Sequence, residues 1–342
     1  MTPLPEPIQV CFLTGEYPPM RGGVGDYTAL LARALAEQGV RCSVVTDRAA
    51  RPASPGERAP LAPAVYPAIG DWGWRGWAQL VGLIDDLRPD VLHIQYQTGA
   101  FAMQPALNLL PLRLRMAGLR LPVALTYHDL KAPYLFPKAG PVRGLANTLL
   151  QSAASAVVVT NVEDLVRVVG RHRLTGAPPW ADRSGRRKVD LIPIGSNIAP
   201  AWLSPPDRAG ARVRLGIEPD ELAIGYFGFV DPWKGVERLV EAVRCLRERG
   251  RRVRLVFVGG TRAGGASPYE AAIAARIDAA ALAGRVVRTG YGSPEETSER
   301  LQALDCIALP FEAGGGYRHG TLAAAIAHHL PIVTTRPSVE AP

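Results

Sequence analysis

The segment best suited to chemistry is PFEAGGGYRHGTLAAAIAHHLPIVTT, residues 310–335. A strand expected from Cys306 to Phe311 runs into three consecutive glycines, which let a backbone approach a ligand closely. Thr321 is a good N-cap for the apolar helix that follows, and the free N–H groups at a helix start bind anions. Arg318 adds a fork of hydrogen-bond donors. The spacing predicts a diphosphate site, with a glycine-rich turn before a core helix as the plainer alternative.

A second glycine-lined helix start lies near the N-terminus, in GEYPPMRGGVGDYTALL. Three glycines within residues 22–25 precede a helix expected from Asp26 to Gln38, so its first N–H groups can face phosphate or sugar oxygens. The spacing matches neither a Walker nor a GxGxxG pattern, and Asp47 is the nearest acid to the end of the second strand. A tight strand–helix turn explains these glycines equally well.

Polar side chains also end two buried strands of the first half. His128 closes LTYHD, where its imidazole would point toward a ligand site; a hydrogen-bonded core histidine is the alternative. Gln95 and Gln97 share one face of the preceding strand, opposite to Tyr96. Buried amides suit a hydroxyl-rich ligand, although they can equally bond loop backbone.

Lys234 supplies a cation in the second half. It stands beside Gly235 at the expected start of a helix that runs to Arg249. A lysine in the first turn opposes the helix dipole, which favours a bound anion there over a solvated surface lysine.

The elements that must position these residues form two successive series of strands and helices. Short, nearly continuous apolar strands alternating with amphipathic helices predict an α/β protein of two Rossmann-like, doubly wound parallel sheets that face each other across a cleft. The expected domains are residues 1–200 and 201–342, joined by a Pro-rich stretch without periodicity near Asn197 to Pro219. The expected strands are 8–15, 41–47, 90–96, 122–129, 156–161, 188–194, 222–230, 252–260, 286–291, 305–311 and 331–335, and the assigned helices are 26–38, 72–87, 105–117, 142–153, 162–169 and 235–249.

Composition excludes several classes of protein. The 342 residues are 47% hydrophobic and 20% charged, as in ordinary globular proteins, and no apolar run reaches the ~18 residues of a membrane span. The N-terminal residues lack a basic leader, so we expect no signal peptide. Four cysteines without CxxC spacing predict reduced thiols and a cytoplasmic protein: Cys11, Cys42, Cys245 and Cys306.

The net charge of +8 is compatible with several kinds of partner. No helix-turn-helix, zinc-finger or RNA-binding signature accompanies it, so we expect no nucleic acid partner. Phosphate-bearing substrates or an anionic membrane surface fit the charge, and a genome biased toward arginine explains it without any partner.

Five motifs occur in the order seen in family 4 glycosyltransferases, which the chain resembles over essentially its whole length. They are GGVGDY at 22–27, YHD at 127–129, IPIGSN at 192–197, FGFVDPWKG at 227–235 and the segment 310–335. The resemblance implies a retaining enzyme of the GT-B fold that uses a nucleotide-activated sugar.

The resemblance also implies roles for individual positions. His128 would contact the donor sugar near the reacting carbon, Lys234 would bind the donor diphosphate, and Gly320 with Thr321 would hold the distal phosphate. The residues expected to act in catalysis are His128, Lys234 and Arg318. Those expected to bind the donor are Gly23, Gly25, Lys234, Tyr291, Gly292, Gly316, Arg318, His319, Gly320 and Thr321. Those expected on the acceptor side are Asp26, Tyr27, Gln95 and Gln97.

The chain departs from the family's pattern in three places. The positions of the usual Glu-x7-Glu pair fall on Gly316 and Ala324, so the ribose hydroxyls need another partner, either backbone or Glu312. Phe229 stands where a basic residue is usual, and Arg318 is expected to restore that charge. After PIVTT the sequence ends at RPSVEAP, without the last strand and helices expected for the second domain, which is therefore expected to be incomplete.

The predicted function is a hexosyltransferase that moves a sugar from a nucleotide diphosphate to a hydroxyl acceptor: a glycan, a lipid-linked molecule or a small molecule. Basic side chains would stabilise the leaving diphosphate, so neither a metal ion nor a cofactor is expected. The alternative is a nucleotide-binding, catalytically silent relative. The loop Lys131–Lys138 and the helix around 107–120 present apolar and arginine side chains that could contact the inner membrane surface; an ordinary packed helix with solvated arginines is the alternative.

Overall fold

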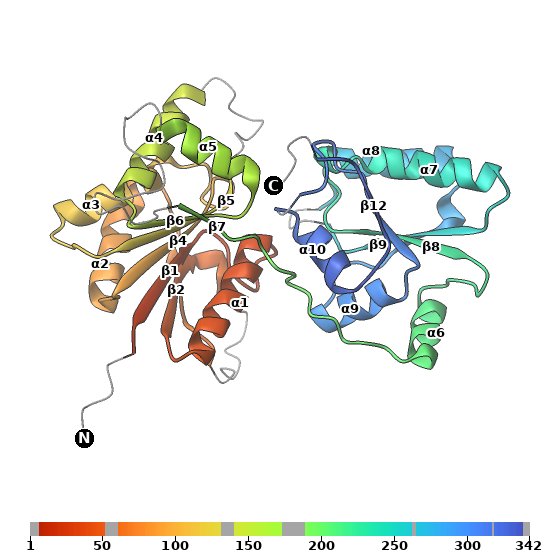
Figure 1. The fold of residues 1–342 in the computed structure, drawn as a ribbon, viewed down its shortest axis with the longest axis horizontal. Helices are drawn as coiled ribbons and strands as arrows, with labels where there is room; N and C mark the ends of the chain where they lie inside the picture. Colours follow the sequence, from red (N-terminus) through yellow and green to blue (C-terminus); the bar gives the residue numbers. More distant parts are fainter. Residues whose placement is uncertain are drawn as a thin grey trace. The chain divides into compact units, whose positions relative to one another are not determined.

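A computed structural model describes residues 7–51, 61–130, 140–172, 189–261, 265–316 and 318–337. The chain divides into two compact units, Met1–Pro193 and Ile194–Pro342. Each unit holds a parallel sheet with helices on both faces, as the sequence predicts (Figure 1).

The first unit contains a seven-stranded sheet in the order β3-β2-β1-β4-β5-β6-β7. Its strands are β1 (Gln9–Thr14), β2 (Arg41–Asp47), β3 (Ala64–Ile69), β4 (Val91–Gln97), β5 (Val123–Asp129), β6 (Ala156–Val159) and β7 (Val189–Leu191). Its α-helices are α1 (Gly23–Glu37), α2 (Trp77–Leu87), α3 (Leu110–Met116), α4 (Gly140–Ala153) and α5 (Val162–His172), and a 3-10 helix, η3 (Pro105–Leu109), precedes α3.

Several bounds in this unit differ from the expected ones, and the helix expected at 105–117 is divided into η3 and α3. Two further features also differ from the sequence-based expectation. Strand β3 is absent from the expected strands. Pro67 within it is tolerated since β3 lies at the edge of the sheet. Helix α1 begins at Gly23 rather than at Asp26, so the glycines form its first turn instead of a loop before it.

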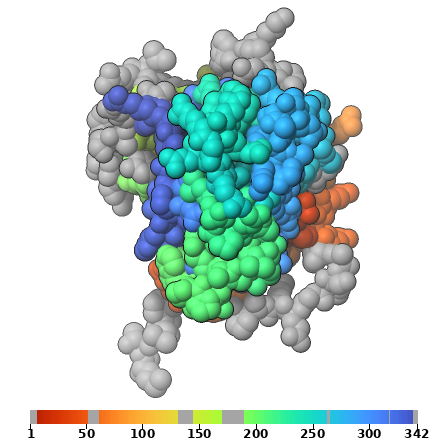
Figure 2. Space-filling model, turned by 90° about the vertical axis from the view of Figure 1, so that its right-hand side faces the viewer, coloured from red at the N-terminus to blue at the C-terminus, as the bar shows by residue number. Residues whose placement is uncertain are grey.

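The second unit contains a five-stranded sheet in the order β10-β9-β8-β11-β12. Its strands are β8 (Leu222–Phe227), β9 (Val253–Val258), β10 (Val286–Arg288), β11 (Cys306–Leu309) and β12 (Ile332–Thr334). Its helices are α6 (Pro205–Arg214), α7 (Val236–Glu248), α8 (Pro268–Ala279), α9 (Pro294–Gln302) and α10 (Gly320–Ala327), with the 3-10 helix η5 (Pro232–Lys234) before α7. Helices α7 and α8 pack side by side (teal and light blue in Figure 2).

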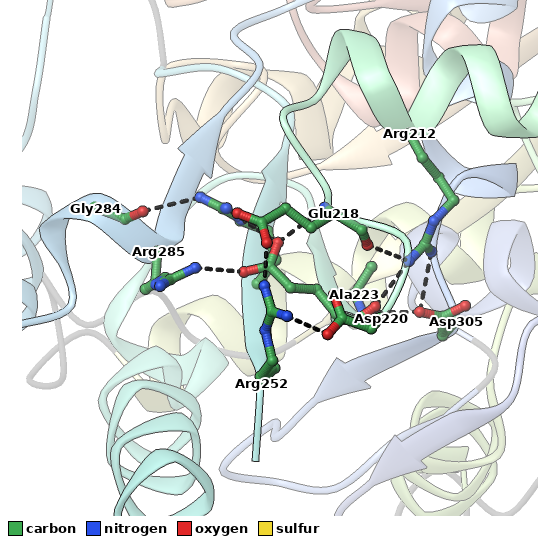
Figure 3. Close-up of polar contacts among 10 residues, drawn as sticks. Arg212, Glu218, Asp220, Ala223, Arg252, Gly284, Arg285 and Asp305 are labelled. Carbon is green, nitrogen blue, oxygen red and sulfur yellow. Dashed lines mark hydrogen bonds and ion pairs between the residues drawn. The ribbon is translucent and has the colours of Figure 1, made fainter. Parts of the chain in front are cut away.

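Helix α6 corrects the expectation of an aperiodic junction. Ser204 caps it through the N–H of Asp207, and Pro205 occupies the first turn, where a missing N–H costs nothing. The guanidinium of Arg212 then bonds the Asp305 carboxylate at 3.0 Å and the carbonyl oxygen of Glu221 at 2.7 Å, which ties α6 to the start of β8 and β11 (Figure 3).

Strand alternation divides the core of the first unit into two layers. Leu13, Ile94 and Leu125 belong to a large apolar cluster that includes side chains of α2, η3 and α4. Phe12 and Val44 point the other way and pack with side chains of α1. The face of the sheet toward α1 is the one that carries the polar residues of β4 and β5. In the described ranges no helix is both long and apolar enough to cross a membrane.

Candidate functional site

The strand order locates a candidate site in each unit separately. The order reverses between β1 and β4 in the first sheet and between β8 and β11 in the second. In open α/β sheets, ligands bind outside the carboxyl ends of the strands at such a reversal. The residues singled out from the sequence follow these strands.

In the first unit a carboxylate occupies the start of α1. Oε1 of Glu16 accepts hydrogen bonds from the N–H groups of Val24 at 2.9 Å and Gly25 at 3.2 Å. A Cβ atom on Gly25 would lie 3.0 Å from the backbone of Glu16 and Tyr17, so this close approach favours glycine. The N–H of Gly25, which we expected to face a phosphate, therefore holds Glu16 instead. A Cβ atom on Gly23 would meet no atom within 4 Å from outside its own stretch of helix.

Asp26 and Tyr27 follow in the first turns of α1. Burial, and second the nearby charge of Glu16, raise the pKa of Asp26 to about 6. The ring of Tyr27 meets the ring of His128 edge-on, with centroids 4.8 Å apart. The structure thus brings together two of the side chains predicted for this unit from separate motifs.

The face of β4 and β5 toward α1 carries a layer of polar side chains. His93 Nε2 lies 2.8 Å from Thr126 Oγ1, and its ring stacks on Phe12. Nearer the carboxyl ends, His128 Nε2 lies 2.8 Å from Gln95 Oε1. Burial lowers the pKa of His93 to about 4, while burial and, second, His93 lower that of His128 to about 3. Both imidazoles are uncharged at neutral pH.

An irregularity at the end of β5 singles out His128. Tyr96 pairs with Tyr127 and Gln97 pairs with Asp129 in the strand register. His128 is therefore an extra residue in β5 that no residue of β4 pairs with in this register. Such bulges re-aim a side chain and are frequent beside active sites. Gln97, half-buried, closes β4 opposite Asp129.

Helix α5 anchors the backbone on either side of His128. The hydroxyl of Thr160, just before α5, donates to the carbonyl of Tyr127 at 3.2 Å. The buried carboxylate of Asp164 accepts the N–H of Leu130 at 3.2 Å and the side-chain N–H of Asn161 at 2.9 Å. These contacts hold the end of β5 in one conformation.

In the second unit Lys234 ends η5 instead of beginning α7. Gly235 follows with φ at 64°, and a Cβ atom there would lie 2.2 Å from the carbonyl oxygen of Pro310, so this position requires glycine. The ammonium of Lys234 lies 4.8 Å from the centre of the Phe311 ring, a cation–π contact. The loops after β8 and β11 therefore meet at Lys234.

Phe311 also packs against the ring of His319. The two rings stack with centroids 3.9 Å apart and planes 10° apart, and the Phe311 side chain is fully buried. The N–H of Gly316 lies 3.1 Å from His319 Nδ1. A Cβ on Gly314, whose φ is 81°, would lie 2.2 Å from the carbonyl oxygen of Arg336, so the glycine run allows the chain to fold tightly.

The start of α10 differs from the prediction that Thr321 is the N-cap of this helix. Its N-cap is His319, in an extended conformation, and Thr321 is already the second helical residue after Gly320. Thr321 cannot cap the helix from there; its buried hydroxyl has no hydrogen-bond partner within the described residues. Arg318 is half-buried just before the N-cap. Arg318 therefore precedes the first-turn N–H groups of α10 by two residues.

The remaining donor-side positions lie after β10. Tyr291 is half exposed, and its N–H would lie 2.7 Å from a Cβ atom on Gly260, so the loops after β9 and β10 touch through their backbones. A Cβ on Gly292 would lie 2.3 Å from the guanidinium of Arg300.

Three other positions considered from the sequence are Asp47, Phe229 and Glu312. Asp47 accepts from the backbone of Ala49 at 2.9 Å and from the indole of Trp72 at 3.1 Å. Phe229 is half-buried, and its carbonyl accepts the Tyr226 hydroxyl at 2.7 Å. Glu312 has an exposed side chain.

Two candidate regions fall outside the described residues: Tyr317 and the loop Lys131–Lys138. Within the ranges that the structure does describe, no three His, Cys, Asp or Glu side chains are grouped as a metal site.

Sequence reasoning missed three contributors to these sites. Glu16 gives no local signal beyond an acid that precedes a glycine-lined helix start. Phe311 is an ordinary strand-end aromatic until the fold brings Lys234 and His319 to it. The bulge at His128 depends on the register between β4 and β5.

Comparison with known proteins gives consistent matches for both units. The family model Glycosyltransferase Family 4 matches residues 21–182, and Glycosyl transferases group 1 matches residues 221–341. The D-inositol 3-phosphate glycosyltransferase of Nocardia farcinica is 31% identical over 127 residues, which are 36% of this chain and 28% of that protein. That of Segniliparus rotundus is 29% identical over 124 residues, 36% of this chain and 27% of the relative. The matched region thus spans less than a third of these relatives.

Solved structures share the fold at low sequence identity. The Anabaena HepE protein in complex with UDP and glucose aligns with a TM-score of 0.68 at 17% identity, covering 97% of this chain and 86% of HepE. Sucrose-phosphate synthase from Thermosynechococcus elongatus aligns with a TM-score of 0.69 at 19% identity, covering 96% and 81% of the two chains. Both alignments extend over both units and agree with a GT-B fold.

Proposed function

The chain belongs to the family 4 glycosyltransferases, and from this premise we propose that it transfers a hexosyl group from a nucleotide-diphosphate sugar to a hydroxyl acceptor with retention at the anomeric carbon. The observation that carries the proposal is the convergence of Lys234, Phe311 and His319 between the ends of β8 and β11, beside the start of α10. The HepE structure with UDP and glucose supports a nucleotide-sugar donor.

The second unit would bind the donor through its diphosphate. When the bond from the sugar carbon to the phosphate oxygen breaks, its electron pair stays on the leaving diphosphate. Lys234, Arg318 and the N–H groups at the start of α10 would stabilise that charge. Tyr291 and Gly292 would contact the base. These groups supply positive charge from the chain itself, so the proposed reaction needs no metal ion.

The first unit would bind the sugar and the acceptor. His128, uncharged at neutral pH, would hydrogen-bond a hydroxyl of the transferred sugar. Asp26, Tyr27 and Gln97 would face the acceptor. Because Glu16 occupies N–H groups at the start of α1, we assign the diphosphate to the second unit.

A panel of nucleotide sugars tests this function. We expect release of free nucleotide in the presence of one donor and a hydroxyl acceptor, and a product whose anomeric proton coupling matches that of the donor. Activity that persists in excess EDTA would agree with a metal-independent reaction. Binding of nucleotide without turnover of any donor would contradict the proposal and indicate a catalytically silent relative.

Lys234→Met tests the assignment of the diphosphate. We expect kcat/KM to fall roughly 10–100-fold, since hydrogen bonds to charged groups contribute about 1.5–3 kcal/mol. The matched control is Arg249→Met, at the other end of α7. Equal effects of the two substitutions would argue against a specific role for Lys234.

We further propose that the first unit makes peripheral contact with anionic membranes through α3 and α4. Two apolar pairs, each one helical turn apart, are exposed: Leu112 with Met116 on α3, and Leu145 with Leu149 on α4. Arg115 joins these helices through the carbonyl of Ala153 at 3.3 Å. Residues 98–162 contain six Lys or Arg and one acidic residue, so the charge favours an anionic surface.

Vesicle co-sedimentation tests this contact. The chain should pellet with phosphatidylserine-containing vesicles at low salt, and Leu112→Ser with Met116→Ser should weaken pelleting. Val213→Ser, an equally exposed apolar residue on α6, is the control. Pelleting that is unaffected by the α3 substitutions would refute this surface.

A further inference from the structure

Gln95 is the buried neighbour that decides how His128 can act. It lies on β4 with no exposed surface, and its side-chain oxygen Oε1 is 2.8 Å from His128 Nε2. The bulge in β5 leaves His128 without a paired residue in the register with β4. Its contact with Gln95 is made between the two side chains. Nε2 of His128 therefore bonds within the protein and does not face a ligand.

The other ring nitrogen remains available. Within the described residues Nδ1 of His128 has no hydrogen-bond partner; the second contact of the ring is edge-on with Tyr27. With Oε1 toward His128, the amide nitrogen Nε2 of Gln95 is buried and has no hydrogen-bond partner among the described residues. Because a carbonyl oxygen only accepts hydrogen bonds, this orientation of the Gln95 amide requires the proton on His128 Nε2. In the neutral ring Nδ1 then carries a lone pair.

We propose that Gln95 is a positioning residue that holds His128 as the neutral Nε2–H tautomer, so that Nδ1 accepts a hydrogen bond from a substrate hydroxyl. This inference rests on the proposed glycosyltransferase function. It also specifies the ligand: a lone pair attracts the O–H of a sugar or acceptor and repels a phosphate oxygen. The uncharged state of His128 at neutral pH agrees with this role.

The tautomer can be measured directly on the full chain. Long-range proton–nitrogen NMR correlations of protein labelled at histidine nitrogen distinguish Nε2–H from Nδ1–H, and His128→Asn identifies the signal. We expect the Nε2–H form for His128 in the unmodified protein. An Nδ1–H form, or a ring protonated on both nitrogens at neutral pH, would overturn the proposal.

Substitution of Gln95 by methionine separates positioning from binding of the nucleotide. Methionine has a similar length and lacks the carbonyl oxygen. We expect Gln95→Met to give a mixture of tautomers and a roughly 10–100-fold lower kcat/KM, with the Kd for UDP unchanged. An unchanged tautomer and kcat/KM would refute the role of Gln95. A change in thermal stability that accounts for the whole loss of activity would refute it as well.

Two substitutions of His128 test which nitrogen faces the substrate. The side-chain oxygen of asparagine stands as many bonds from Cβ as Nδ1, whereas the amide of glutamine reaches as far as Nε2. We therefore expect His128→Asn to keep more activity than His128→Gln; the reverse order would contradict the assignment. If the unmodified chain turns over no donor, the proposed function fails, while the NMR measurement still decides the tautomer.

Discussion

Replacing Glu221 by glutamine should strongly destabilise the second unit. The carboxylate of Glu221 has no exposed surface. Its Oε2 accepts from Arg254 Nε and from the N–H of Glu218, both at 3.0 Å, and its Oε1 accepts from Arg285 at 2.7 Å. Figure 3 shows Arg285 beside the Glu221 carboxylate and Arg252 beside Glu218 and Asp220. Glutamine keeps the shape but removes the charge that two guanidinium groups share.

The magnitude follows from the burial of the partners. The side chain of Arg254 is 12% exposed and cannot turn fully into water when its partner is lost, whereas that of Arg285 is 38% exposed and can. Loss of one member of a buried ion pair costs about 3–5 kcal/mol. For a unit of this size we therefore expect the unfolding temperature to fall by roughly 6–20 °C.

Differential scanning calorimetry of the full chain provides the assay. Burial alone raises the pKa of Glu221, but the hydrogen bonds from Glu218 and Arg254 outweigh it and lower the pKa below its ordinary value. The stabilisation is therefore complete above the unfolded pKa of about 4.3 and is lost as the pH falls through the lower folded pKa. The difference between the two proteins should be full at pH 7 and shrink below about pH 4.

A matched control distinguishes burial from pairing. Glu241→Gln removes a partner of Arg244 from the exposed surface of α7, and we expect no measurable shift. A Glu221→Gln protein that unfolds within a degree of the unmodified chain at pH 7 would show that Arg254 and Arg285 find other partners, and the reasoning from buried charge would be wrong.

Two further substitutions test the loops at the candidate sites. Gly235→Ala should reduce activity and should destabilise the second unit by more than Gly250→Ala does. Both glycines have a positive φ, but only at Gly235 would the new Cβ lie 2.2 Å from a backbone oxygen. Equal unfolding temperatures of the two variants would refute the steric argument. Glu16→Ala should destabilise the first unit by about 1 kcal/mol, as loss of a helix cap does, measured by chemical denaturation. Glu37→Ala, at the far end of α1, is its control, and an effect of the same size there would argue against capping.

The arrangement of elements could be read from the sequence because it depends on local patterns. Short apolar strands alternating with amphipathic helices predict parallel sheets, and both sheets are parallel. Helix α7 shows such an amphipathic pattern, since its buried residues Val236, Leu239, Val240 and Val243 lie on one face. Strand β3 and helix α6 are absent from the sequence-based expectation because proline usually marks a break in an element. Proline is nevertheless tolerated at a sheet edge and in a first helical turn.

The chemistry at the sites was only partly contained in these patterns. The sequence by itself determined which residues end strands, and so placed Gln95, His128 and Lys234 near the ligand-binding edges of their sheets. Only the tertiary structure decided their partners, because each partner lies on another strand or loop: Gln95 is 33 positions from His128, and Phe311 comes to Lys234 across the β8–β11 reversal. Strand order and register set these contacts, and both arise from packing of the whole sheet rather than from neighbouring residues. For the same reason the carboxylate of Glu16 at the start of α1 became apparent only in the folded chain.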